Sequence, residues 1–157
     1  MNIQTAPAST PDIPALRLGY AGLLPFVLGA LLVWAVRADV QPYVELALSA
    51  YAAVVLSFLG GIHWGLAMRQ SQPAPAPAQP AGPDWGLTWG VVPSLVAWAA
   101  VLMPPDAGLV ILGAMLIVSY AVDRRLYPAH GAAGWLTLRF RLSAVAALCC
   151  FIGAAGS

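Results

Sequence analysis

The sequence predicts an all-α integral membrane bundle of five transmembrane helices. Of its 157 residues, 61% are hydrophobic and only 8% are charged, and the mean hydropathy is +0.80. A soluble domain carries about a quarter charged residues. So few charges cannot cover a surface in water, so we expect lipid as the solvent. The long apolar runs show no period of two, which argues against strands.

Cutting the chain at its charges leaves five apolar segments, which are the expected spans: 18–36, 44–68, 85–103, 107–122 and 142–155. The first three reach the roughly 20 residues that the hydrocarbon core needs, whereas the last two are short. Pro25 predicts a kink in the first span, because proline removes a backbone donor and clashes with the carbonyl of Ala21. The stretch Val36–Ala38 resembles a signal-peptidase site, but no basic residue precedes Arg17 in the leader, so we expect no cleavage.

The segments outside the spans differ in kind. We expect residues 1–16 to be a disordered tail and residues 17–157 to form a single membrane domain. The alternating proline and alanine of 71–83 predict an extended linker of the polyproline type. The prolines at 104 and 105 predict a tight turn, so the third and fourth spans form an antiparallel hairpin. Residues 135–141 mix apolar side chains with arginine, and we expect them at the interface before the fifth span.

The arginines predict the orientation of the bundle. Five spans place six of the seven arginines on one side, with only Arg37 on the other; the six are Arg17, Arg69, Arg124, Arg125, Arg139 and Arg141. Because cytoplasmic loops carry the excess of basic residues, we expect the N-terminus in the cytoplasm and the C-terminus outside.

The second span carries a ridge of small residues at every fourth position, namely Ser49, Ala53, Ser57, Gly61 and Gly65. In lipid, small side chains let helix backbones approach closely. The ridge therefore predicts a contact face for another helix, within the chain or in a dimer. Cys149 and Cys150 are adjacent, which rules out an unstrained disulfide between them, and we expect both to be small buried core residues.

Polar and aromatic side chains gather at the cytoplasmic ends of the spans. They form a candidate polar or ligand cluster of His63, Trp64, Trp85, Trp89, Tyr120, Asp123 and Arg139. An aromatic belt with snorkelling charges explains most of them. It explains His63 and Asp123 less well, since both are ionisable groups near the ends of apolar helices. The two arginines directly after Asp123 could neutralise its carboxylate.

His63 has four interpretations. It could make a structural hydrogen bond or ion pair with Asp123, contact lipid headgroups, or belong to a ligand site or proton relay. It could also bind haem or a metal, but His130 is the only other histidine. We expect no metal and no cofactor.

The sequence carries no motif of a known catalytic mechanism. It lacks HExxH, GxSxG and a phosphate-binding glycine loop, so we expect no catalytic residues and no enzyme. A net charge of +1 gives no reason to expect nucleic acid as a partner.

Four stretches carry a resemblance to a known family: LGYAGLLPF (18–26), YAAVVLSFLGGIHWG (51–65), WGVVPSLVAW (89–98) and GWLTLRFRLSAVAAL (134–148). They resemble domain-of-unknown-function family 3429, small bacterial multi-pass membrane proteins similar to mitochondrial transmembrane protein 69. The resemblance implies a multi-pass protein of the bacterial cytoplasmic (inner) membrane, and it brings no reaction, cofactor or catalytic residue.

Two function classes follow. The first is a non-enzymatic accessory or structural membrane subunit, whose partners are membrane lipids and either another membrane protein or a second copy of the chain. The alternative is a carrier or sensor that binds a lipid or small molecule at the cytoplasmic ends of the helices.

Overall fold

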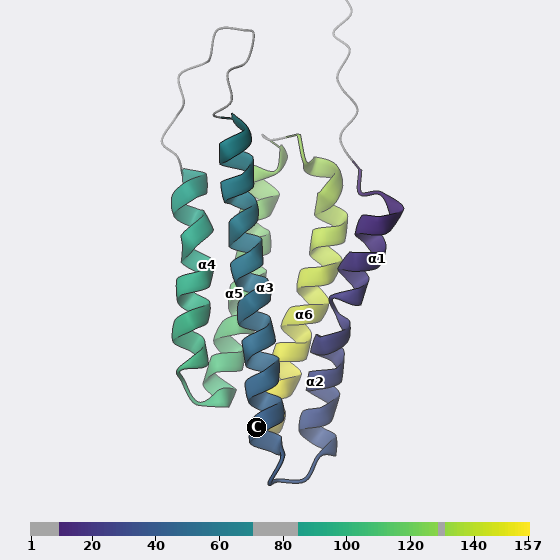
Figure 1. Ribbon diagram of the computed structural model, residues 1–157, viewed down its shortest axis with the longest axis vertical. Coiled ribbons are helices and arrows are strands. Elements are labelled where there is room, and N and C mark those ends of the chain that lie inside the picture. Colours follow the sequence, from purple (N-terminus) through teal and green to yellow (C-terminus); the bar gives the residue numbers. More distant parts are fainter. Residues whose placement is uncertain (1–9, 71–84, 129–130) are drawn as a thin grey trace, which may run out of the picture.

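The computed structural model describes residues 10–70, 85–128 and 131–157, and within them the chain is helical without strands. The elements are α1 (Ile13–Ala21), α2 (Leu24–Ala35), α3 (Gln41–Gln70), α4 (Trp85–Val101), α5 (Pro105–Leu126), the 3₁₀ turn η2 (Ala133–Trp135) and α6 (Leu136–Gly156). They run up and down the long axis of the molecule (Figure 1). The predicted all-α class is confirmed. The predicted linker 71–83 lies outside the described residues, as do the first nine residues of the predicted tail.

The helices have the length and composition of membrane spans. Four described segments are long and apolar enough to cross a bilayer: Ile13–Ala35, Gln41–Met68, Pro105–Leu126 and Ala133–Gly156. The helix α4 is apolar but shorter. Large apolar side chains such as Leu31, Phe58 and Trp98 are exposed on the outside, as expected of a surface that faces lipid. The protein is thus a multi-pass membrane protein.

The first pass begins earlier than predicted. The helix α1 starts at Ile13, because the Asp12 side chain accepts a hydrogen bond from the amide of Ala15 at 3.1 Å and Pro14 stands in the first turn. A capping aspartate followed by proline is a common way to begin a helix. The expectation of a disordered tail is therefore corrected over residues 13–16.

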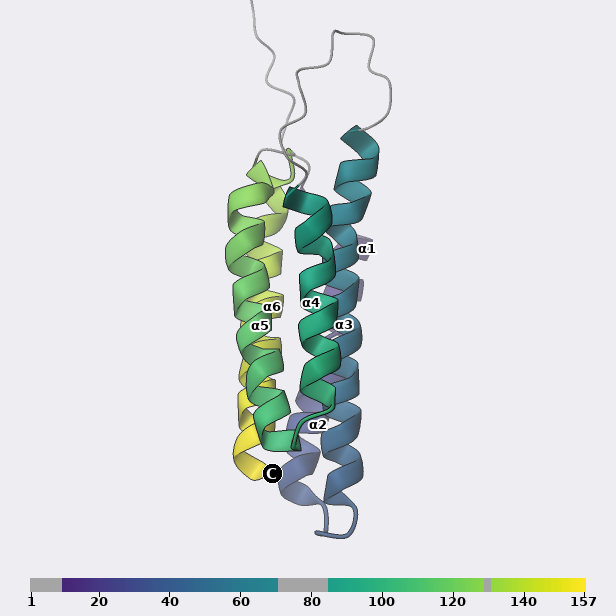
Figure 2. The ribbon, with the colours of Figure 1, turned by 90° about the vertical axis from the view of Figure 1, so that its left-hand side faces the viewer.

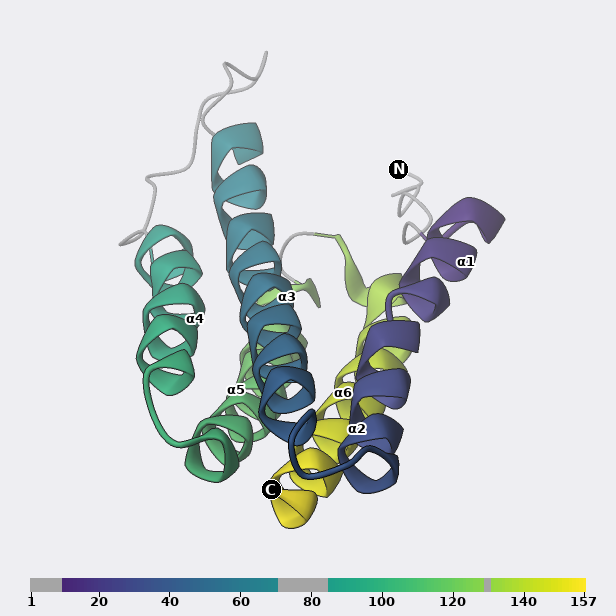
Figure 3. The same cartoon turned by 60° about the horizontal axis from the view of Figure 1, so that its bottom comes forward.

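The predicted kink in the first pass is confirmed. The helix is interrupted at Gly22 and Leu23, just before Pro25, and resumes as α2. The phenol of Tyr51 on α3 donates a hydrogen bond to the carbonyl oxygen of Gly22 at 2.8 Å. Below this break α2 packs against α3 and α6, whereas α1 contacts mainly α6 and lies apart from α3 (Figure 3).

The packing face of α3 differs from the predicted ridge. Ser49 is buried and Ala53 is half-buried, but Ser57, Gly61 and Gly65 are exposed. A Cβ atom added at Gly61 or Gly65 would meet nothing within 4 Å. The prediction that the ridge contacts another helix of the same chain is therefore wrong at Ser57, Gly61 and Gly65.

The close approach lies one residue earlier, between α3 and α4. A Cβ atom at Gly60 would overlap the carbonyl oxygen of Gly90, and one at Gly90 would lie 2.8 Å from the carbonyl oxygen of Gly60. The two glycines thus let the backbones touch, which is the physical role expected of small residues in lipid.

The helices α4 and α5 form the predicted hairpin. The helix α4 ends at Val101 and α5 begins at Pro105 (Figure 2). A Cβ atom at Gly108 would lie 2.5 Å from the carbonyl oxygen of Ala100, so the two helices approach closely beside the turn. The glycine removes the side chain that would otherwise hold them apart.

The helix α6 is longer than the predicted fifth span and packs most closely on α5. It begins at Leu136, so residues 136–141 belong to the helix rather than to a separate interfacial segment. Arg139 in this stretch is buried rather than at an interface, because it is paired within the bundle, as described below. Cys149 and Cys150 are buried free thiols on this helix, as predicted.

Candidate functional site

Three charged or ionisable side chains from three helices meet inside the bundle. The two oxygens of the Asp123 carboxylate on α5 have different partners. One lies 2.9 Å from Nε2 of His63 on α3, and the other accepts hydrogen bonds from Arg139 on α6, with 2.9 Å to its Nε and a second bond from its Nη2. His63, Asp123 and Arg139 are only 3%, 1% and 8% exposed. We call these three residues the buried triad.

The triad satisfies its own charges. An ionised carboxylate only accepts hydrogen bonds, so Nε2 of His63 carries the proton in this contact. Asp123 and Arg139 form an ion pair without net charge. Removing such groups from water is costly unless each is paired and hydrogen-bonded. Here both oxygens of the carboxylate have a hydrogen-bond partner, His63 for one and Arg139 for the other. Of the four interpretations of His63, the structure shows the first, the hydrogen-bonded pair with Asp123.

The arginine that neutralises Asp123 is not a sequence neighbour. Arg124 and Arg125 were expected as candidates, but both are exposed. They follow Asp123 on a helix, where consecutive side chains point about 100° apart. Arg139 takes this role because the first turns of α6 lie beside the last turns of α5.

Tyr127 extends the triad at the end of α5. It is buried, and its ring centre lies 6.3 Å from that of His63. Burial raises the pKa of the Tyr127 phenol above its ordinary value, partly opposed by the charge of Arg139 and by a hydrogen bond from that side chain. The phenol therefore stays neutral near pH 7. The sequence places Tyr127 on the Asp123 face of the helix but gave no reason to single it out.

The four aromatic residues of the predicted cluster lie outside the triad. The indole of Trp64 donates to the carbonyl oxygen of Leu87 at 3.1 Å, and Trp85 is 73% exposed. The indole nitrogen of Trp89 is buried without a partner among the described residues. The ring of Tyr120 packs against Phe140 with centres 5.4 Å apart. The structure thus brings together His63, Asp123 and Arg139 but not the aromatic members.

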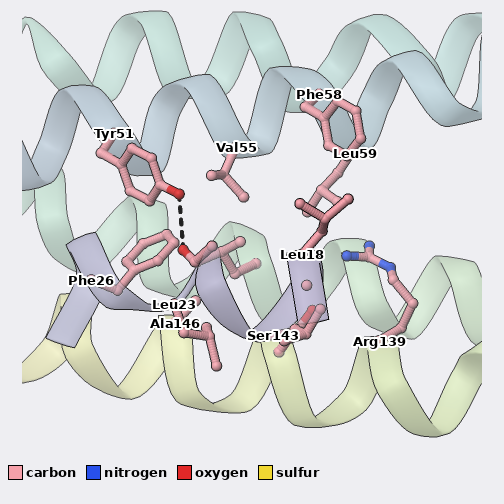
Figure 4. A pocket seen from close by; sticks show the side chains of 14 residues that line it. Leu18, Leu23, Phe26, Tyr51, Val55, Phe58, Leu59, Arg139, Ser143 and Ala146 are labelled. Carbon is pink, nitrogen blue, oxygen red and sulfur yellow. Dashed lines mark hydrogen bonds between the residues drawn. The ribbon is translucent and has the colours of Figure 1, made fainter. Parts of the chain in front are cut away.

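A cleft opens beside the triad, between α1, α3 and α6. Its outer chamber has a volume of about 710 Å³ and is lined by residues that include Ala15, Ile62, Leu66, Tyr127 and Trp135. A second chamber, of about 230 Å³, extends along the break between α1 and α2 toward Phe26 and Tyr51 (Figure 4). We call it the inner chamber because it lies nearer the middle of the helices, and both chambers are open to the outside of the bundle. Both chambers share Leu18, Gly19, Phe58, Leu59, Arg139 and Leu142. We call the two chambers together the α1 cleft.

The α1 cleft is almost entirely apolar. Arg139 is the charged side chain that lines it among the described residues, and its charge is balanced by Asp123. Figure 4 places the Arg139 guanidinium at one end of the inner chamber, with Phe26 and Tyr51 at the other. The cleft is thus suited to a hydrocarbon chain with a polar group near one end.

The described residues do not assemble a metal site. They contain no group of three or more His, Cys, Asp or Glu side chains with the geometry to hold a metal ion. His130, the candidate second ligand for haem, lies outside the described residues.

Comparisons with known proteins agree with a membrane protein of unassigned activity. The family described as "Protein of unknown function (DUF3429)" matches residues 11–155. Transmembrane protein 69 of Xenopus tropicalis is 43% identical over 122 residues, which cover 74% of this chain and 44% of that protein. Transmembrane protein 69 of Mus musculus is 32% identical over 115 residues, which cover 73% and 44%. The aligned region is thus less than half the length of these relatives, and no solved structure matches.

Proposed function

Because the chain belongs to the DUF3429 family, whose function is unknown, and has several helices able to span a membrane, we propose that it is a non-enzymatic protein that binds a membrane lipid in the α1 cleft. The observation that carries this proposal is the pair of adjoining apolar chambers, which share six lining residues, beside the buried triad. It favours the carrier or sensor class over a purely structural role.

The dimensions of the cleft suit a lipid. The outer chamber, at about 710 Å³, falls within the roughly 300–1,000 Å³ typical of ligand sites. Its α1 wall contacts mainly α6 rather than α3, which leaves space between α1 and α3 on the membrane side. An acyl chain could enter from the bilayer without leaving its apolar surroundings.

The buried triad supports the other two walls. It links α3 to α6 through Asp123 on α5, so the two helices that face α1 are held at a fixed separation at this end of the bundle. It also neutralises Arg139, whose unbalanced charge would otherwise disfavour a hydrocarbon ligand. The triad therefore acts in this proposal as a positioning element and not as a catalytic group.

We also propose that the end of the bundle holding the triad faces the cytoplasm of a bacterial inner membrane. The support is the six arginines that the sequence assigns to this side, against Arg37 on the other. A reporter enzyme that works only outside the cytoplasm is expected to be active when it is fused after Ser157. A fusion that is active only in the cytoplasm would reverse this orientation.

An accessory subunit is the second candidate function. It is favoured by the exposed end of the small-residue ridge, where Gly61 and Gly65 have open space beside them. A helix of another membrane protein or of a second copy could approach α3 closely there.

Purification of the full-length chain in mild detergent, followed by mass spectrometry of everything retained, tests the first proposal. We expect the wild-type protein to keep about one lipid per chain. Leu18→Trp should lose it, because Leu18 lines both chambers yet is 74% exposed and therefore tolerates a larger side chain. The matched control is Leu31→Trp, at an exposed position on α2 that lines neither chamber.

The outcomes separate the two functions. A wild-type protein without lipid, or an equal lipid content in both variants, would contradict binding in the α1 cleft. A stable protein partner that is retained by Leu18→Trp and lost by Gly61→Leu would instead establish the accessory role.

A further inference from the structure

The inner chamber holds a hydroxyl group without a partner. Ser143 on α6 lines this chamber one helical turn beyond Arg139 (Figure 4). It is 4% exposed, and its Oγ makes no hydrogen bond to any described residue. A buried hydroxyl that finds no acceptor is unfavourable. The serine thus keeps an unused donor in the wall of the chamber, for an occupant that packs against it.

The charge inside the cleft favours a neutral acceptor. Arg139 is balanced by Asp123, and no other charged side chain among the described residues lines either chamber. A phosphate in the inner chamber would find no unpaired cation, and the burial of an uncompensated charge is strongly unfavourable. A carbonyl oxygen carries no such cost and can accept the hydrogen bond that Ser143 offers.

The charge around the mouth of the cleft favours an anionic headgroup. The same end of the bundle exposes Arg17 on α1 and Arg141 on α6. Arg141 also donates a hydrogen bond to the phenol of Tyr20 at 3.3 Å, next to where α1 and α6 meet. Arg124 and Arg125 at the end of α5 are exposed as well. Exposed arginines near a bilayer surface attract anionic lipids.

We propose, on the premise that the α1 cleft is the lipid site proposed above, that its ligand is an ester-linked anionic glycerophospholipid. One acyl chain fills the inner chamber, its ester carbonyl accepts a hydrogen bond from Ser143, and the charged headgroup remains outside near Arg17 and Arg141. The site therefore selects for the ester linkage in the interior and for negative charge at the surface.

Lipid titration of the delipidated full-length protein, followed by native mass spectrometry, tests this assignment. The probes are palmitoyl-oleoyl phosphatidylglycerol, a phosphatidylglycerol with ether-linked chains, and palmitoyl-oleoyl phosphatidylcholine. We expect wild-type protein to bind the ester lipid about fivefold more tightly than the ether lipid, the effect of one neutral hydrogen bond. Phosphatidylcholine should also bind more weakly than phosphatidylglycerol, and this difference should shrink as salt is added.

Two serine variants locate the effect. Ser143→Ala should bind the ester and ether lipids alike, because it removes the donor and adds no bulk. The matched control is Ser119→Ala: this serine on α5 is also buried without a partner among the described residues but lines neither chamber. It should keep the fivefold preference.

The failures are distinguishable. Equal binding of ester and ether lipids by wild-type protein, or a preference that survives Ser143→Ala, would overturn the ester contact and leave lipid binding intact. Equal binding of phosphatidylglycerol and phosphatidylcholine at low salt would overturn the anionic headgroup. If the wild-type protein binds none of the three lipids, the proposed function fails as well.

Discussion

Asp123→Asn is expected to destabilise the folded protein by about 3–5 kcal/mol, the range observed when one partner of a buried ion pair is removed. The amide leaves the guanidinium of Arg139, which is 8% exposed, without a counter-charge. It also weakens the contact with His63 on α3. The measurement is the free energy of unfolding in mixed detergent micelles, compared with the wild-type protein.

Two further variants make the result for Asp123 specific. Asp106→Asn changes the exposed acid in the first turn of α5, and it should cost less than about 1 kcal/mol, the effect of a charge on the helix dipole. The triple variant His63→Leu, Asp123→Leu and Arg139→Met should recover most of the stability, because apolar side chains often replace a buried charged network without loss. If Asp123→Asn costs no more than Asp106→Asn, the triad does not hold the three helices together.

Gly60→Ala is expected to destabilise the protein by about 1–3 kcal/mol, the usual cost of overpacking a well-packed interior. The added methyl group would overlap the carbonyl oxygen of Gly90 and push α4 away from α3. The free energy of unfolding in mixed micelles measures the cost. Its control is the adjacent Gly61→Ala, which meets nothing within 4 Å and should be neutral or stabilise by up to about 1 kcal/mol through higher helix propensity.

The pair of glycine variants also decides which face of α3 is the packing face. Equal costs for both would mean that α3 does not meet α4 at Gly60. A larger cost for Gly61→Ala would place the important contact on the exposed ridge, in favour of an intermolecular partner.

The sequence was sufficient for the class of the protein and for part of its polar site. Lipid demands long apolar helices, so composition alone led to the membrane class. The depth of His63 and Asp123, each counted from the end of its helix, was enough to suggest that they meet. Both inferences rest on local sequence, and each is independent of how the helices are arranged around one another.

The rest depended on that arrangement. On α3, the small residues at every fourth position form one stripe. The face that packs against α4 includes Gly60 instead. Helical spacing alone does not distinguish these two faces. Asp123 is neutralised by a residue 16 positions away rather than by its neighbours. Because Arg139 was expected outside the fifth span, the start of α6 was predicted too late in the sequence. The α1 cleft exists because α1 lies apart from α3, and no periodicity in the sequence encodes that separation.

The most direct test of lipid binding in the α1 cleft is photo-crosslinking in a bilayer. Full-length protein is reconstituted with a phosphatidylglycerol that carries a diazirine on one acyl chain, and the modified peptides are identified by mass spectrometry after irradiation. Binding in the cleft predicts adducts concentrated on inner-chamber residues such as Phe26 and Tyr51, and their loss in Leu18→Trp. Adducts spread evenly over exposed positions such as Leu31 and Trp98, with none enriched in the inner chamber, would contradict it.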